Sequence, residues 1–109
     1  MVDNRVNYDI ISDMKINIPS ETLHDIIKIA KIDEIKQVYL FGSRARGTHG
    51  RFSDIDLAIR GGDASSYRQD LNDFANSYLF FDTVNLDTTT SEKLKQEVAR
   101  EGILLYEQA

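Results

Sequence analysis

The chain has 109 residues, which suits one domain with a modest core that buries roughly two-thirds of the unfolded surface. Its formal net charge of −5 argues against a broad basic face for nucleic acid, because such binding depends on neutralising many phosphates. The absence of cysteine excludes disulfides and thiolate metal sites. Residues 1–8 are polar and no apolar run reaches membrane-spanning length, so we expect a cytoplasmic protein that does not contact a membrane.

The N-terminal residues 1–19 show neither clean helical nor clean strand periodicity. Val6, Tyr8 and Ile10 alternate with polar residues, a pattern compatible with an extra strand or with an arm that packs on a partner. A loosely attached leader is an equally good interpretation, because chain termini are frequently poorly ordered. We therefore divide the chain into an N-terminal extension, residues 1–19, and a single domain, residues 20–109.

A first helix is predicted to begin at Ser20, directly after Pro19, since proline is common at helix starts. Apolar residues then recur at helical spacing: Leu23, Ile26, Ile27 and Ala30. They form one stripe, which predicts a helix face that packs on a core. The segment from Asp33 to Gln37 leads into an apolar run, Val38 to Phe41, that predicts the first strand.

Gly42 and Ser43 close that strand with a turn. A glycine directly after a strand lets the backbone approach a ligand closely, and Ser43 would cap a short helix whose free N–H groups face phosphate. The next loop contains arginines whose positive charge would balance the negative charge of a polyphosphate. They are Arg44, Arg46 and Arg51. Taken alone, such a Gly-Ser pair is usually just a turn, so its significance depends on the strand that comes after this loop.

The second predicted strand, Ile55 to Ile59, carries a pair of aspartates. Because side chains alternate across a strand, Asp54 and Asp56 share one face, and the isoleucine and leucine side chains share the other. Two close carboxylates raise each other's pKa and destabilise the fold unless a cation lies between them. Their oxygens suit Mg²⁺ or Mn²⁺, and Mg²⁺ typically binds one or two protein carboxylates together with substrate phosphates. Coming after the glycine turn, the pair indicates a metal and nucleotide site.

Together, Gly42-Ser43, ten intervening residues and Asp54-Ile55-Asp56-Leu57 resemble the signature of the DNA polymerase β-like nucleotidyltransferase superfamily. In detail, residues 42–47 and 53–59 resemble its small bacterial and archaeal branch, the minimal nucleotidyltransferases. The resemblance extends from about Leu23 to Tyr106. It agrees with the fold class that the predicted elements indicate, α/β (α+β), and implies a small mixed sheet with helices packed on one face and the site on the other.

The remaining elements are predicted from periodicity. A helix is predicted over residues 64–77, and apolar residues at threes and fours indicate its core face. These are Tyr67, Leu71, Phe74, Ala75 and Tyr78. Residues 79–86 predict a third strand. Residues 89–92 have the form of a capping box that starts at Thr89, Gly102 would end the helix after it, and residues 103–106 suit a short final strand or an apolar tail.

Asp82 lies within the predicted third strand, between apolar neighbours. A buried carboxylate without a partner costs several kcal/mol, and a position beside Asp54 and Asp56 would give it one. In the resembling family a later strand contributes a third carboxylate, and Asp82 matches that position, although the residues after it depart from the family's pattern. Asp87, near the end of the strand, is the alternative.

The resemblance implies a metal-dependent nucleotidyltransferase that uses ATP and Mg²⁺ or Mn²⁺. Its catalytic and metal-binding residues would be Asp54, Asp56 and Asp82. Its nucleotide-binding residues would be Gly42, Ser43, Arg44 and Arg46. Minimal nucleotidyltransferases are similar to antitoxins that transfer AMP to a tyrosine of a partner HEPN-domain ribonuclease. A HEPN toxin, joined with this chain in a hetero-oligomer, is therefore the partner that the resemblance implies.

Two other functions stay open. The chain would act without catalysis if it neutralised such a toxin by binding and masking it. Alternatively, it would transfer a nucleotide to a small molecule such as an aminoglycoside, although no domain for binding that acceptor is visible. The intact Gly-Ser turn and aspartate pair favour catalysis over masking.

Overall fold

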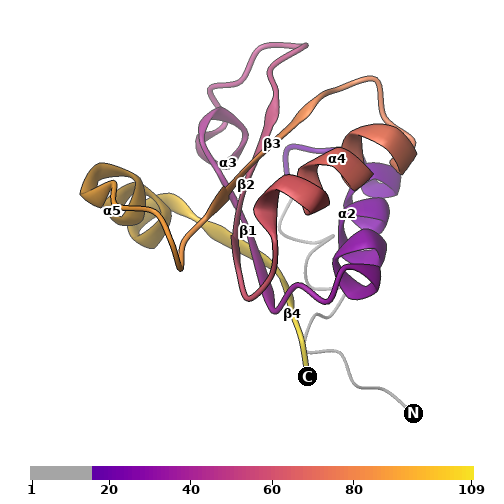
Figure 1. Cartoon of the computed structure of the whole chain (residues 1–109). Helices are drawn as coiled ribbons and strands as arrows, with labels where there is room; N and C mark the ends of the chain where they lie inside the picture. The colour runs from indigo at the N-terminus through magenta and orange to yellow at the C-terminus, as the bar shows by residue number, and fades with distance from the viewer. Residues whose placement is uncertain (1–15) are drawn as a thin grey trace.

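The computed structural model describes residues 16–109 (Figure 1). The elements in chain order are α2 (Ser20–Ile32), β1 (Gln37–Phe41), α3 (Ser43–Arg46), β2 (Ile55–Arg60), α4 (Ala64–Phe74), β3 (Phe81–Asn85), α5 (Glu92–Glu101) and β4 (Ile103–Glu107). Most of the extension expected over residues 1–19 lies outside the described residues, and the division of the chain at residue 20 stays a prediction. Within the described range, no helix has the length and apolar character needed to cross a bilayer.

The strands form one mixed sheet in the order β3-β2-β1-β4. β1 runs antiparallel to both β2 and β4, whereas β2 and β3 are parallel. A parallel pair needs a crossover connection, and α4 lies between these two strands in the chain. The arrangement confirms the predicted fold class, and residues 103–107 form a strand and not an apolar tail.

Two helices, α2 and α4, cover one face of the sheet (Figure 1). The alternation in β2 supplies the sheet side of this contact, because Ile55, Leu57 and Ile59 are fully buried in the main core. The predicted stripe of α2 supplies the other side. Tyr67 of α4 is also fully buried and donates a hydrogen bond from its hydroxyl to the carbonyl oxygen of Ile26 at 2.8 Å. Hydrophobic packing therefore fixes the orientation of β2.

The opposite face of the sheet is covered only in part. There, Val98 of α5 packs with Phe41, Ala58 and Leu86 in a second, smaller cluster. This helix lies on the side of the sheet away from α2 and α4 (Figure 1), a position that the expected arrangement of helices on one face did not include. Because α5 covers one part of the face, the polar side chains of β2 and β3 occupy the other.

Two sequence predictions for α4 are wrong. The helix ends at Phe74 and not near residue 77, because the backbone N–H of Asn76 donates to the Asp25 carboxylate and the chain turns away. Phe74 and Tyr78, which the periodicity assigns to the core, are 75% and 68% exposed. Tyr78 lies in the connection to β3, where helical spacing no longer determines which side chains face the core.

The caps of the short helices also differ from the predictions. Ser91, and not Thr89, caps α5: its side chain accepts a hydrogen bond from the Leu94 backbone N–H at 3.1 Å. The backbone of Gly102 ends that helix as predicted. At α3 the N-cap is Gly42, and Ser43 is the first helical residue.

Candidate functional site

The parallel pairing of β2 and β3 brings two of the predicted carboxylates together. Asp56 is the register partner of Asp82, so their Cα atoms lie on neighbouring strands that are about 4.8 Å apart. Asp56 is partly buried, and the side chain of Asp82 is 56% exposed. Asp54 is exposed and stands just before β2. The three aspartates therefore gather at one end of these two strands.

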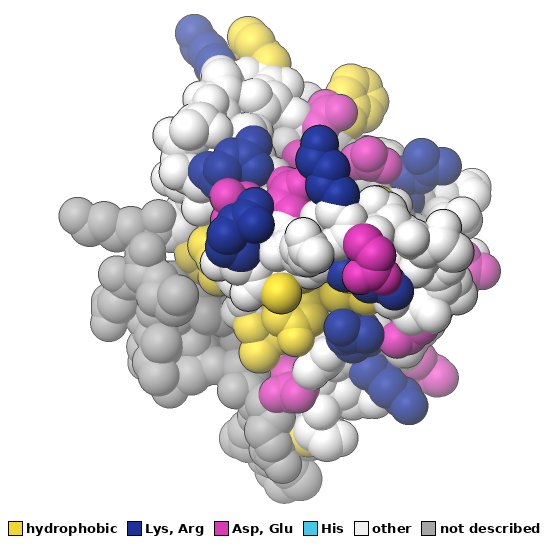
Figure 2. Space-filling view, turned by 90° about the vertical axis from the view of Figure 1, so that its left-hand side faces the viewer, with side chains coloured by type: hydrophobic (Ala, Val, Ile, Leu, Met, Phe, Trp, Pro, Cys, Tyr) yellow, Lys and Arg dark blue, Asp and Glu magenta, His cyan; other side chains and the backbone are white. Residues whose placement is uncertain are grey.

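The carboxyl group of Asp56 has a perturbed pKa. Burial, followed by the charges of Asp82, Asp54 and Glu97, raises the pKa of Asp56 to about 6, and Arg46 opposes this shift. Burial and the neighbouring carboxylates therefore disfavour the charged form of Asp56 more strongly than Arg46 favours it. Figure 2 shows the result on the surface, where acidic side chains in the upper part of this face are flanked by Lys and Arg side chains.

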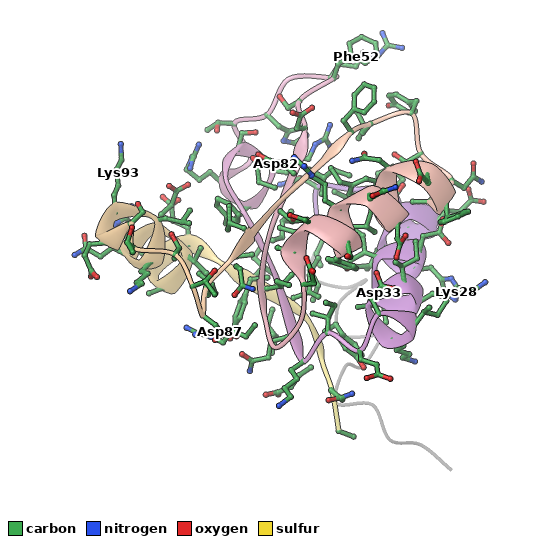
Figure 3. All side chains as sticks on the ribbon, viewed as in Figure 1. Lys28, Asp33, Phe52, Asp82, Asp87 and Lys93 are labelled. Carbon is green, nitrogen blue, oxygen red and sulfur yellow. The ribbon has the colours of Figure 1, made fainter. Side chains whose placement is uncertain are left out.

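Asp87, the alternative third carboxylate, lies at the other end of β3 (Figure 3). Its side chain accepts a hydrogen bond from the backbone N–H of Gly61 at 2.8 Å and pairs with Arg60 at 3.4 Å. These contacts hold the loops after β2 and β3 together. Geometry therefore favours Asp82 over Asp87 as the companion of Asp56.

The glycine turn contacts the same carboxylate. Gly42 has a φ of +74°, a left-handed conformation that glycine adopts without strain. A methyl group added at this position would collide with the Asp56 carboxylate. Phe41, the residue before the turn, is also the register partner of Asp56 in the antiparallel pair. The predicted phosphate turn and the predicted metal ligand are thus direct neighbours in space.

Arg44 is buried, with 5% of its surface exposed. Its guanidinium donates hydrogen bonds to the backbone carbonyls of Asn17 at 2.8 Å, Ser53 at 3.0 Å and Arg51 at 3.3 Å. The carbonyl of Arg44 itself accepts from the Asn17 side chain at 2.8 Å. These bonds assign Arg44 to holding the loop that precedes Asp54, and its contact with a nucleotide stays a prediction.

Arg46 bonds to two glutamates that the sequence analysis did not single out. It contacts Glu97 at 3.1 Å and Glu101 at 3.2 Å, both on α5. The spacing of Glu97 and Glu101 could have indicated a shared cation, because residues four apart lie on one helix face. Arg68 on α4, 4.0 Å from Asp82, was also missed, and nothing in the sequence pairs these two residues. The site is therefore bordered by cations from two different helices.

The donor set fits a hard divalent cation. Carboxylate oxygens are the ligands that Mg²⁺ prefers, and a cation bound here would oppose the burial and the repulsion that raise the pKa of Asp56. Within residues 16–109, no three or more His, Cys, Asp or Glu side chains converge on a single point. A site built from two adjacent carboxylates still matches the usual Mg²⁺ pattern, in which water and substrate phosphates complete the ligand shell.

Comparison with known proteins places this geometry in a family. The model described as Polymerase beta, Nucleotidyltransferase matches residues 24–109, which include every predicted site residue. A comparison with curated proteins finds no match.

Similar chains also occur in solved toxin–antitoxin structures. A chain from a crystal structure of a toxin–antitoxin with AMP-PNP is 32% identical, with a TM-score of 0.63 over 79% of this chain and 73% of that chain. Another, from the MntA–HepT toxin–antitoxin, is 26% identical, with a TM-score of 0.58 over 80% and 71%. A third, from a tri-AMPylated Shewanella oneidensis HEPN toxin in complex with MNT antitoxin, is 27% identical, with a TM-score of 0.57 over 80% and 71%. The family model and the shared fold agree, and this chain belongs to the polymerase β nucleotidyltransferase family.

Proposed function

We propose that this chain is a protein adenylyltransferase and acts as an antitoxin. It transfers AMP from ATP to a tyrosine hydroxyl of a HEPN-type ribonuclease toxin with which it forms a complex. One observation carries the proposal: the backbone of Gly42 lies against the Asp56 carboxylate, and Asp56 pairs in register with Asp82. A phosphate-binding turn and an acidic cluster in contact are what phosphoryl chemistry requires.

In the reaction the tyrosine oxygen bonds to the α-phosphorus of ATP, the bond from that phosphorus to the bridging oxygen breaks, and pyrophosphate leaves. Asp82 accepts the proton of the tyrosine hydroxyl, since it is exposed and beside Asp56. Asp54, Asp56 and Asp82 would hold Mg²⁺ or Mn²⁺, which when bound neutralises phosphate charge and lowers the pKa of the acceptor hydroxyl.

The remaining site residues bind and orient the nucleotide. The backbone of Gly42 and Ser43 would hold the departing phosphates, because the glycine lets that backbone lie directly against the Asp56 carboxylate and the proposed cation site. Arg46 supplies positive charge from the edge of the site. Its pairing with Glu97 and Glu101 links α5 to the edge of the site. Most of the catalysis would then come from positioning the reactants and balancing their charge.

The similar solved structures support the toxin partner. They include a toxin–antitoxin with AMP-PNP and an antitoxin bound to a tri-AMPylated HEPN toxin. An ATP analogue and an AMP-modified toxin are what an enzyme of the proposed specificity would bind and produce.

A matched pair of variants tests the proposal. The purified chain is incubated with ATP, Mg²⁺ and a HEPN-type ribonuclease encoded beside it, and the rate of AMP transfer is measured. We expect Asp82→Asn to lower that rate by about 100-fold or more, whereas Asp87→Asn, which removes a carboxylate at the opposite end of β3, changes it less than about threefold.

Other outcomes identify the alternative functions. Inhibition of the ribonuclease by the wild-type chain without any AMP transfer would show a masking partner. Transfer of AMP to an aminoglycoside and not to the ribonuclease would show an enzyme of small molecules. Equal rates for Asp82→Asn and Asp87→Asn would contradict the role of Asp82.

A further inference from the structure

Three aromatic side chains stand exposed beside the site. We call Phe52, Tyr78 and Phe80 the aromatic patch; their exposed fractions are 70%, 68% and 70%. The rings of Phe52 and Tyr78 meet edge to face with 6.0 Å between centroids, and the guanidinium of Arg51 lies 5.5 Å from the centre of the Phe52 ring. These contacts join Phe52 to Tyr78 and to Arg51 without burying the two rings.

Chain connectivity places the aromatic patch next to the carboxylates. Phe52 precedes Asp54 by two residues and Phe80 precedes Asp82 by two. Burial alternates from Leu79 to Asp82, so Phe80 and Asp82 are both exposed while the residues between and before them are buried. At about 3.3 Å per residue, Phe80 stands roughly 7 Å from Asp82 along the strand. Phe52 projects at the tip of its loop, above Asp82 (Figure 3).

The two segments that carry the patch are tied together. The backbone N–H of Ile55 donates to the carbonyl of Phe80 at 2.9 Å, and Arg44 holds the loop of Phe52 through the carbonyls on either side, those of Arg51 and Ser53. The rings therefore belong to one fixed surface and not to two independent loops. A preorganised surface loses less entropy when a partner binds.

The area of the patch fits part of a protein interface. A large aromatic side chain contributes 150–250 Å² when it is buried, so three rings exposed to this extent offer roughly 300–500 Å². Exposed apolar patches of that size on small proteins commonly mark binding sites. One partner contributes about 800 Å² to a standard protein interface, and the patch would supply about half of that area.

Chemistry selects a polypeptide as the occupant. Phosphates of a nucleic acid would meet the charges of Asp54 and Asp82 beside the rings, on a chain with a net charge of −5. Aromatic and arginine side chains, by contrast, are the residues enriched at protein interfaces. Figure 2 shows hydrophobic side chains projecting above the acidic part of this face.

We propose that the aromatic patch docks the polypeptide that carries the acceptor hydroxyl and so delivers that hydroxyl to Asp82. This inference rests on the proposed function for the identity of the polypeptide, a HEPN-type ribonuclease. It adds the surface on this chain that selects the acceptor, since a patch that begins two residues before the general base along the strand would hold the residues that flank the modified tyrosine.

The test uses the full-length double variant Phe52→Ser/Phe80→Ser and the ribonuclease. We expect its dissociation constant for the ribonuclease, measured without ATP, and its KM for the ribonuclease to rise about tenfold or more. Its KM for ATP and its kcat should stay within about twofold, since neither ring belongs to the catalytic set. Phe52→Leu/Phe80→Leu, which keeps apolar side chains, should recover most of the affinity. Thermal melting confirms that each variant is folded.

Phe74→Ser is the matched control. Phe74 is 75% exposed but lines a pocket of about 350 Å³ between α2 and α4, together with Ile29 and Asp70. We expect this variant to bind the ribonuclease like the wild type. Equal weakening by Phe74→Ser would overturn the proposal, because it would show a general effect of removing surface aromatics.

Each other outcome has a defined meaning. An altered KM for ATP with unchanged affinity for the ribonuclease would make the patch a base-stacking surface and overturn the docking role. A dimer of the wild-type chain that the double variant loses would assign the patch to a second copy. If the wild-type chain binds the ribonuclease through the patch but transfers no AMP, docking stands and the proposed catalysis fails. If the double variant binds the ribonuclease without weakening and transfers AMP normally, catalysis stands and the docking role fails.

Discussion

The two faces of the sheet use the same strand in opposite ways. Toward α2 and α4, β2 presents Leu57 and its isoleucine neighbours, all fully buried. Toward the other side it presents Asp56, whose pKa is raised by partial burial and by neighbouring carboxylates against the opposing effect of Arg46. The core face stabilises the fold, whereas the partial burial of the Asp56 carboxylate and its repulsion by neighbouring carboxylates lower the stability. Removing a side chain should therefore have opposite effects on stability and activity on the two faces.

Asp56→Asn should give the largest effect, on the acidic face. We expect AMP transfer to fall by about 100-fold or more, because a ligand of the proposed cation is lost. The free energy of unfolding at pH 7 should rise, on the order of 1 kcal/mol after allowance for solvent screening, because the variant removes a partly buried charge and its repulsion by neighbouring carboxylates. Transfer assays and urea denaturation measure the two quantities. A variant that lost both activity and stability would contradict the comparison.

Leu57→Ala is the reciprocal change on the core face. The side chain is fully buried in the main core, and the loss of such a side chain typically lowers the free energy of unfolding by about 2–5 kcal/mol. Molecules that remain folded should keep their rate of AMP transfer, since the residue points away from the site. Denaturation and transfer assays well below the melting temperature check this. An unchanged melting temperature would contradict the assignment of the core.

Gly42→Ala should lower both the stability and the rate of AMP transfer. An added methyl group would require a left-handed conformation and collide with the Asp56 carboxylate. We expect a loss of about 1–3 kcal/mol of stability together with a clear fall in transfer, because the turn and the carboxylate must separate. Gly50→Ala is the control, since its φ is not positive and Ser53 lies at an ordinary contact distance. Equal behaviour of the two variants would argue against a tight turn.

We expect the pH dependence of stability to reflect two carboxyl groups with raised pKa values, one on each side of the sheet. Burial, a hydrogen bond with Asp70 and that residue's charge raise the pKa of Asp33 to about 6; Asp33 follows α2 (Figure 3). Because folding raises the pKa of each group, its contribution to the free energy of unfolding is greatest below pH 4. This contribution falls as the pH rises from 4 to 6.

The two carboxyls can be separated by variants and by Mg²⁺. Asp33→Asn and Asp56→Asn should each flatten part of the decline in unfolding free energy between pH 4 and 6. Mg²⁺ at pH 7 should raise the melting temperature of Asp33→Asn as it does for the wild type, but not that of Asp56→Asn, because binding to the native state stabilises it. An equal response to Mg²⁺ in both variants would place the cation elsewhere.

The fold was largely predictable from local patterns. Strand alternation separated Asp56 from Leu57, and the stripe on α2 identified its buried face. The register that joins Asp56 to Asp82 was not predictable from periodicity, because it depends on pairing between segments far apart in the chain. Family resemblance supplied that residue. It did not supply the contact between Gly42 and the Asp56 carboxylate, which appears only when β1 and β2 pair.

The directions of side chains in loops were also not predictable from the sequence. Arg44 follows the phosphate turn, and its positive charge suggested a nucleotide ligand, yet its guanidinium is buried among the carbonyls of the next loop and of Asn17. Tyr78 continued a helical pattern, yet the chain had already left the helix. In both cases backbone hydrogen bonds outside the local segment decide where the side chain lies.

The most direct test of the central claim is the intact mass of a HEPN-type ribonuclease encoded beside this chain, after co-expression with the wild type or with Asp56→Asn. We expect a mass increase of whole AMP units with the wild-type chain and none with the variant, although both chains bind the ribonuclease. An unmodified ribonuclease in a stable complex with the wild-type chain would contradict the proposed AMP transfer.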